Sequence, residues 1–340
     1  MTKKCLERPA VYTERVGDSH FLGSRPSVTY CLWGLLQYTD KKGISLAEVN
    51  ALAGYAFSLN IFKDTVHIGG PFIYAGEERF QQALANLGYD FKVLNFLPVE
   101  PDTVTDVLDT AQRSIDRGVP IILWDIFHAE FGLVYGYDDN KRQLNGLDKL
   151  REEPLAYDLI GKGKTAEIGF ISITTRNKTD RRTAIIRMLN QAIEHGYTAE
   201  PIKHADGELA KGLAAYDAWM EAFQGGRIVS FFNAYNIVVY AELRQFGVQF
   251  LRELLEEFQD HEMIEACIRK CVGHYEAVAA ALKGLAELFP FPGGGDPKDP
   301  DNIINAIKFL EDAKRAEAKG LRELNQLRAC IVSLQPGGVE

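Results

Sequence analysis

Cys31 is the residue best suited to covalent chemistry in this sequence. It opens the apolar face formed with Leu32, Leu35 and Tyr38, just after a predicted helix start at 27–30. A cysteine in the first turn of a helix lies near the positive end of the helix dipole and near free backbone N–H groups, which favour the thiolate. Because the thiolate is the nucleophilic form, the position predicts acyl chemistry, provided that a base lies on a later element. The alternative interpretation is a small residue packed in a core.

Two residues are candidates for that base. His128 and Glu130 lie two positions apart at the start of a predicted strand over 130–137, and they share a face if the strand extends back to 128. Asp148 follows the predicted returning strand, 142–147, and could orient whichever of the two acts. The face of the first strand that carries Gly132, Val134 and Gly136 has little side-chain bulk, so we expect the Cys31 helix to pack there.

These residues belong to a stretch that mixes helix and strand patterns. We predict an α+β domain over 1–178, in which helices pack on an antiparallel sheet. The helices are predicted at 45–52, 77–87 and 101–117, and the strands at 91–94, 119–125, 130–137, 142–147 and 168–173. The turn residues at 138–141 predict an antiparallel pair on either side of them.

Only helices are predicted after residue 178. Apolar residues recur at steps of three and four over 228–258, which indicates a long helix with a buried stripe. Similar patterns mark helices at 207–223, 264–285 and 303–331. The domain 179–340 is therefore predicted to be an all-α helical bundle.

Several short motifs resemble one known family. The segments 31–38 (CLWGLLQY), 43–48, 54–57 (GYAF), 118–121 (GVPI) and 133–139 (LVYGYDD) resemble two blocks of the family of the butirosin-biosynthesis acyltransferase. The segment 212–219 (GLAAYDAW) resembles the C-terminal region of that family. The family is distantly similar to bacteriocin-processing cysteine peptidases and is assigned a papain-like fold.

The resemblance implies a Cys–His–Asp centre for acyl transfer, with Cys31 as the nucleophile. It also implies a small or carrier-linked acyl substrate and a role in secondary metabolism. In the register of the family the histidine position holds Glu130, and His128 lies two residues earlier. A carboxylate cannot become the imidazolium that stabilises a thiolate. Three hypotheses follow: His128 replaces the family histidine, Glu130 acts with a raised pKa, or the site no longer performs this chemistry.

Composition narrows the functional classes. The chain has 340 residues, 46% of them hydrophobic, and a formal net charge of −9, which argues against nucleic acid or an anionic membrane as a partner. The five cysteines show no metal-ligand spacing, so we predict neither a metal nor another cofactor. Free thiols, a first segment without an apolar run and the lack of any apolar stretch of about 20 residues predict a cytoplasmic protein.

Three functional hypotheses remain. The first is a cysteine acyltransferase or amide hydrolase that uses Cys31, His128 or Glu130, and Asp148. The second is a catalytically inactive papain-like module that binds a small molecule or a protein. The third is a structural protein that forms homo-oligomers through its helical domain, which native mass spectrometry would test.

Overall fold

A computed structural model describes residues 3–10, 25–73, 77–204 and 207–334 of the chain. Helices and an antiparallel sheet are both present, so the fold is α+β, as predicted. The chain divides into two compact units, residues 1–49 with 87–178 and residues 50–86 with 179–340. The boundary after residue 178 coincides with the predicted one, whereas the predicted first domain loses 50–86 to the helical unit.

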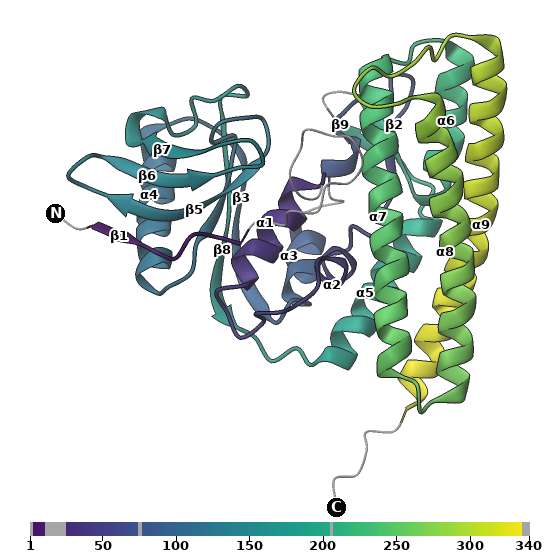
Figure 1. The fold of residues 1–340 in the computed structure, drawn as a ribbon, viewed down its shortest axis with the longest axis horizontal. Helices are drawn as coiled ribbons and strands as arrows, with labels where there is room; N and C mark the ends of the chain where they lie inside the picture. The colour runs from purple at the N-terminus through teal and green to yellow at the C-terminus, as the bar shows by residue number, and fades with distance from the viewer. Residues whose placement is uncertain (1–2, 11–24, 74–76, 205–206, 335–340) are drawn as a thin grey trace, which may run out of the picture. The chain divides into compact units, whose positions relative to one another are not determined.

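The first unit contains a sheet of seven strands among the residues described (Figure 1). The strands are β1 (Lys3–Cys5), β3 (Tyr89–Pro98), β4 (Ile121–Trp124), β5 (Phe131–Asp138), β6 (Gln143–Leu147), β7 (Glu152–Ala156) and β8 (Glu167–Arg176). Their order is β3-β8-β4-β5-β6-β7, with β1 paired to β5, and every pairing is antiparallel.

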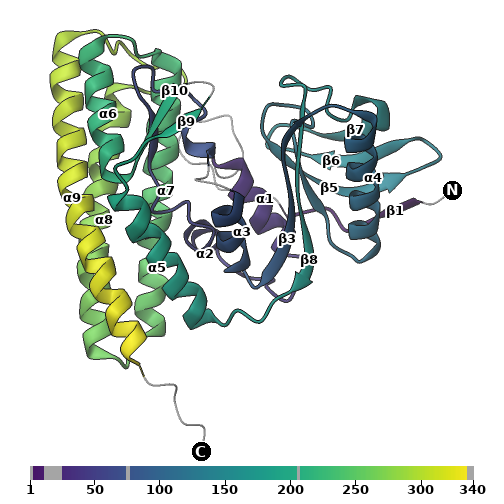
Figure 2. The same cartoon turned by 180° about the vertical axis from the view of Figure 1, so that it is seen from behind.

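One face of this sheet is covered by α4 (Pro101–Asp116), as Figures 1 and 2 show. The helix begins with a proline at its first position and with a reciprocal capping interaction between Glu100 and Thr103. Its apolar side, which includes Val107 and Ala111, forms a core with Val134 of β5. The strictly local signals of this helix explain why its bounds agree with the prediction within one residue.

The helix α1 (Ser27–Leu36) packs on the other side of β5. Gly34 lies close against β5, because a Cβ built on it would lie 2.8 Å from Cδ1 of Leu133. The expectation that α1 packs on the face of Gly132 and Gly136 is therefore wrong. A Cβ on Gly132 would meet Ile126 and the Leu147 carbonyl, and one on Gly136 would meet Asn145 and Cys5. Those glycines make room for a loop and for neighbouring strands.

The second unit combines long helices with a small sheet. Its helices are α3 (Glu77–Ala85), α5 (Arg181–Tyr197), α6 (Gly212–Gly225), α7 (Ser230–Glu257), α8 (Glu262–Leu288) and α9 (Pro300–Ser333), and α2 (Leu46–Leu52) spans the division between the units. Its strands, β2 (Asn60–Phe62), β9 (Ile202–His204) and β10 (Gly207–Lys211), form an antiparallel sheet in the order β2-β10-β9.

This small sheet corrects the prediction that only helices follow residue 178. The predicted helix over 207–223 begins at Gly212, and the five residues before it form β10. The apolar residues of that segment fit a helical period, but the strand pairs with β2, which lies about 150 residues earlier in the sequence. Pairing between distant segments leaves no local signal.

No helix in the described ranges combines the length and apolarity that a membrane crossing requires. Among the same residues, no group of three or more His, Cys, Asp and Glu side chains could hold a metal ion.

Candidate functional site

Cys31 lies in the middle of α1 and not in its first turn. The helix begins at Ser27, after Pro26, so Cys31 is one full turn further along. Hydrogen bonds fix this end of the helix: Thr29 donates to the Pro26 carbonyl, and the Ser27 hydroxyl accepts from the backbone N–H of Phe131, at 3.1 Å in each case. The dipole effect falls off beyond the first turn. The helix start therefore positions Cys31 against β5 but does little to ionise it.

Burial dominates the chemistry of the Cys31 thiol. The residue is 2% exposed, and this burial raises its pKa well above the ordinary value for cysteine. The positive charge of Lys149 lowers the pKa, while the negative charges of Glu130 and Asp148 raise it. This direction is opposite to the expectation of a favoured thiolate. Two of the predicted site residues, Glu130 and Asp148, therefore lie in the electrostatic surroundings of the sulfur.

His128 and Asp148 form a hydrogen-bonded pair. Nδ1 of His128 lies 2.8 Å from Oδ2 of Asp148, and the Asp148 side chain is fully buried. The other carboxylate oxygen, Oδ1, accepts backbone N–H bonds from Leu150 and Arg151, each at 2.8 Å. Leu133 of β5 pairs with Leu147 of β6, which brings the residue after β6 beside the segment before β5. A carboxylate anchored in this way fixes both the ring orientation and the tautomer of a histidine.

Glu130 has a different partner. Its Oε2 lies 3.9 Å from Nζ of Lys149, whose side chain is 3% exposed and which also donates to the Arg25 carbonyl. A buried lysine needs an opposite charge close by, and Glu130 supplies one. The strand does not extend back to His128 as the prediction of a shared face required. β5 begins at Phe131, and His128 and Glu130 lie in a bend in which the Glu130 N–H donates to the His128 carbonyl.

The structure therefore brings the predicted residues together in part. His128 pairs with Asp148, and Glu130 pairs with Lys149. The charges of Lys149, Glu130 and Asp148 affect the pKa of Cys31. Within the described part of the chain, no hydrogen bond joins Cys31 to the His128 ring. Lys149 is the residue that the sequence reasoning missed. The signal for it was an adjacent pair of opposite charges, Asp148 and Lys149, directly after a predicted strand.

A groove of about 340 Å³ borders the same bend in the first unit. Ile126 and Phe127 line one part of it, and Arg151, Lys162 and Lys164 contribute cationic side chains. Neither Cys31 nor His128 lines this groove.

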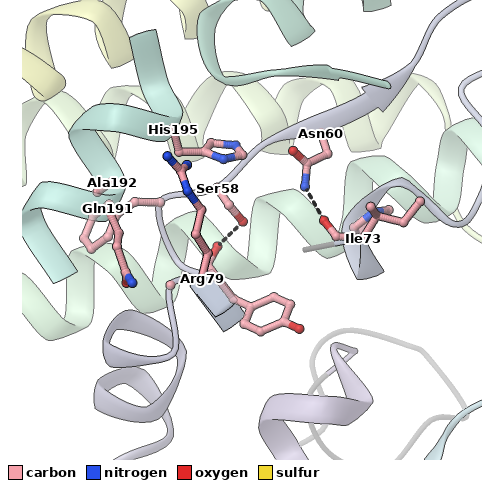
Figure 3. Close-up of a pocket in the computed structure, with 11 residues that line it drawn as sticks. Ser58, Asn60, Ile73, Arg79, Gln191, Ala192 and His195 are labelled. Carbon is pink, nitrogen blue, oxygen red and sulfur yellow. Dashed lines mark hydrogen bonds between the residues drawn. The ribbon is translucent and has the colours of Figure 1, made fainter. Parts of the chain in front are cut away.

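The second unit contains a separate small cavity of about 40 Å³, shown in Figure 3. Its polar residues include Asn60 of β2, Arg79 of α3, and Gln191 and His195 of α5, and Phe57 and Ile73 belong to its apolar lining. Nε2 of His195 lies 3.0 Å from the Leu59 carbonyl oxygen and 3.2 Å from the Leu59 backbone nitrogen. Burial lowers the pKa of His195 to about 4, despite the bond to Leu59, and the charges of Arg244, Lys211 and Arg79 add to the effect.

We expect His195 to make the stability of the protein fall in mild acid. A histidine whose pKa is lowered on folding binds its proton more readily in the unfolded state, so stability is lost as the pH falls from about 6.5 towards 4. Between pH 7 and pH 5 this costs about 2 kcal/mol. Urea unfolding at both pH values checks it, with His195→Phe as the comparison. If the wild type and the variant lose equal free energy of unfolding, the assignment is wrong.

The sequence matches no protein-family model, and a comparison with curated proteins also finds no match. The function must therefore be argued from the chemistry of these two sites.

Proposed function

We propose that the protein is a cysteine-dependent acyltransferase or amide hydrolase with a papain-like first unit. Cys31 would be the nucleophile, His128 the general base and acid, and Asp148 the residue that orients His128. The observation that carries the proposal is the 2.8 Å bond between His128 Nδ1 and an aspartate whose second oxygen is anchored by two backbone N–H groups. This arrangement favours His128 over Glu130 as the base, because Glu130 faces Lys149.

The proposed reaction has two steps. In the first, Nε2 of His128 takes the Cys31 proton while the sulfur attacks the acyl carbonyl, and the leaving group departs with the proton from the imidazolium. In the second, water or an acceptor nucleophile attacks the thioester while His128 takes its proton, and the Cys31 sulfur leaves the acyl group and regains that proton from His128. Lys149 would stabilise the transient thiolate, since its charge lowers the pKa of Cys31. The resemblance in the motifs at 31–38 and 133–139 supports a small or carrier-linked acyl donor.

A second candidate function follows from the burial of the sulfur. A thiol that is 2% exposed and has a raised pKa also fits a papain-like module that binds a ligand without reacting with it. The two candidates differ in one measurable property, which is whether Cys31 accepts an acyl group.

We expect p-nitrophenyl acetate to transfer one acetyl group per chain to Cys31, with release of p-nitrophenolate. Peptide mapping by mass spectrometry locates the acetyl group, and absorbance gives the rate. The measurement should use a Cys5→Ser background, because Cys5 is the exposed cysteine of the described chain. His128→Gln is expected to slow acetylation about 10²–10⁴-fold, the usual contribution of a general base, and Cys31→Ser to abolish it.

The proposal fails if Cys31 stays unmodified, or if His128→Gln acetylates at the wild-type rate. Either result would favour the binding module. Unfolding curves of each variant show whether a loss of reactivity reflects a loss of structure.

A further inference from the structure

The small cavity of the second unit contains an unsatisfied polar atom. Asn60 is 5% exposed, and its Nδ2 donates to the Ile73 carbonyl at 3.0 Å. Its backbone is also satisfied, because the Tyr240 hydroxyl accepts from the Asn60 N–H and donates to the Asn60 carbonyl. Oδ1 is buried and has no hydrogen-bond partner among the described residues. Rotating the amide would set Oδ1 against the Ile73 carbonyl, so the orientation is fixed.

Asn60 lines the cavity, and Figure 3 shows its Oδ1 on the side of the amide that is turned away from Ile73 and towards His195. A buried acceptor without a donor costs about 1–3 kcal/mol. A hydroxyl or amino hydrogen that reached Oδ1 would remove this cost.

The backbone over 56–60, which includes residues that line the cavity, is fixed by hydrogen bonds to other elements. Nη1 of Arg244 donates to the carbonyls of Ala56 and Ser58, each at 2.9 Å, and the Leu59 carbonyl accepts from Gly212. Together with the Tyr240 bonds to Asn60, these contacts fix the backbone over 56–60. A rigid binding segment loses little conformational entropy when a ligand binds.

Arg79 is the charged side chain among the residues that line the cavity, and the charges of Arg79 and Lys211 both lower the pKa of His195. The nearest carboxylate to Arg79 is Glu194, at 3.2 Å. Both side chains of that pair are about half exposed, so the ion pair is worth at most about 1 kcal/mol. An anionic group that enters the cavity can therefore replace Glu194 as the ion-pair partner of Arg79.

We propose that this cavity binds a small carboxylate that also carries a hydroxyl or amino group. The carboxylate pairs with the planar guanidinium of Arg79, and the hydroxyl or amino group donates to Oδ1 of Asn60. Phe57, Pro71 and Ile73 supply apolar contacts, and the volume of about 40 Å³ restricts the occupant to a small molecule. The proposal does not depend on Cys31, because all of these residues belong to the second unit.

Isothermal titration calorimetry of the full chain with four small probes tests the ligand chemistry. Glycolate and glycine carry both the carboxylate and a donor, acetate lacks the donor, and glycolamide lacks the charge. We expect glycolate, glycine or both to bind with a millimolar or lower Kd, and acetate and glycolamide to bind about tenfold more weakly. The proposal is overturned if neither glycolate nor glycine binds, if acetate binds as tightly as they do, or if inorganic phosphate binds in their place.

Two substitutions at the rim of the cavity should act in opposite directions. Arg79→Met removes the cation and is expected to weaken binding at least tenfold, whereas Glu194→Gln removes the competing carboxylate and should tighten it a few-fold. Arg269→Met is the matched control, because Arg269 is an exposed arginine paired with Glu265 on α8 and lies outside the cavity. Equal affinities for the wild type and Arg79→Met would overturn the proposal. Since Arg79 is about half exposed, its removal should leave the fold intact.

Discussion

Asp148→Asn is expected to slow acetylation of Cys31 about 10²–10⁴-fold while the unfolding temperature stays nearly unchanged. The reason lies in the fixed orientation of this side chain. Oδ1 accepts two backbone N–H bonds, so the amide nitrogen of an asparagine would have to take the place of Oδ2 and donate to Nδ1 of His128. His128 would then carry its proton on Nε2, where it could no longer accept the proton of the thiol.

The measurement is the rate of p-nitrophenolate release at pH 7, with thermal unfolding as the second readout. Asp158→Asn is the matched control, since Asp158 is an exposed aspartate of the same unit. An Asp148→Asn protein that acetylates Cys31 at the wild-type rate would show that His128 does not act through Asp148. The proposed mechanism would then lose its main support.

Arg244→Leu is expected to lower the free energy of unfolding by about 3–5 kcal/mol, the usual cost of removing one partner from a buried ion pair. Arg244 is fully buried on α7, and its Nη2 lies 2.7 Å from Oε1 of Glu317 on α9. The variant leaves the Glu317 charge in the core. It also removes the donors to the Ala56 and Ser58 carbonyls.

Denaturant unfolding of three variants separates these contributions. Arg244→Leu with Glu317→Leu should recover part of the lost stability, because the buried charge is gone while the two carbonyls still lack their donor. Arg252→Leu, which breaks the exposed pair with Glu276, should cost less than about 1 kcal/mol. A loss of that small size for Arg244→Leu would contradict the assignment of Arg244 and Glu317 as a buried ion pair that stabilises this unit.

The amino-acid sequence by itself determined the elements that have strong local signals. Pro101 and Gly118 delimit α4, and the alternation over 130–137 predicts β5 to within one residue. The apolar period over 228–258 predicts α7 to within two residues at its start and one at its end. Turn, capping and period signals depend on neighbouring residues, so they can be read without the fold. The same local reasoning selected Cys31, His128, Glu130 and Asp148 as the residues to consider.

Tertiary structure decided which of those residues meet, and in what state. The bend before β5 pairs His128 with Asp148 and Glu130 with Lys149, whereas the sequence predicted a shared strand face for the two candidates. Burial raises the pKa of Cys31, which lies beyond the first turn of α1. The segment 50–86 joins the helical unit through β2 and β10, and its Asn60 acquires an unsatisfied oxygen only through that packing. Desolvation and contacts between distant segments depend on the whole fold, so no local pattern contains them.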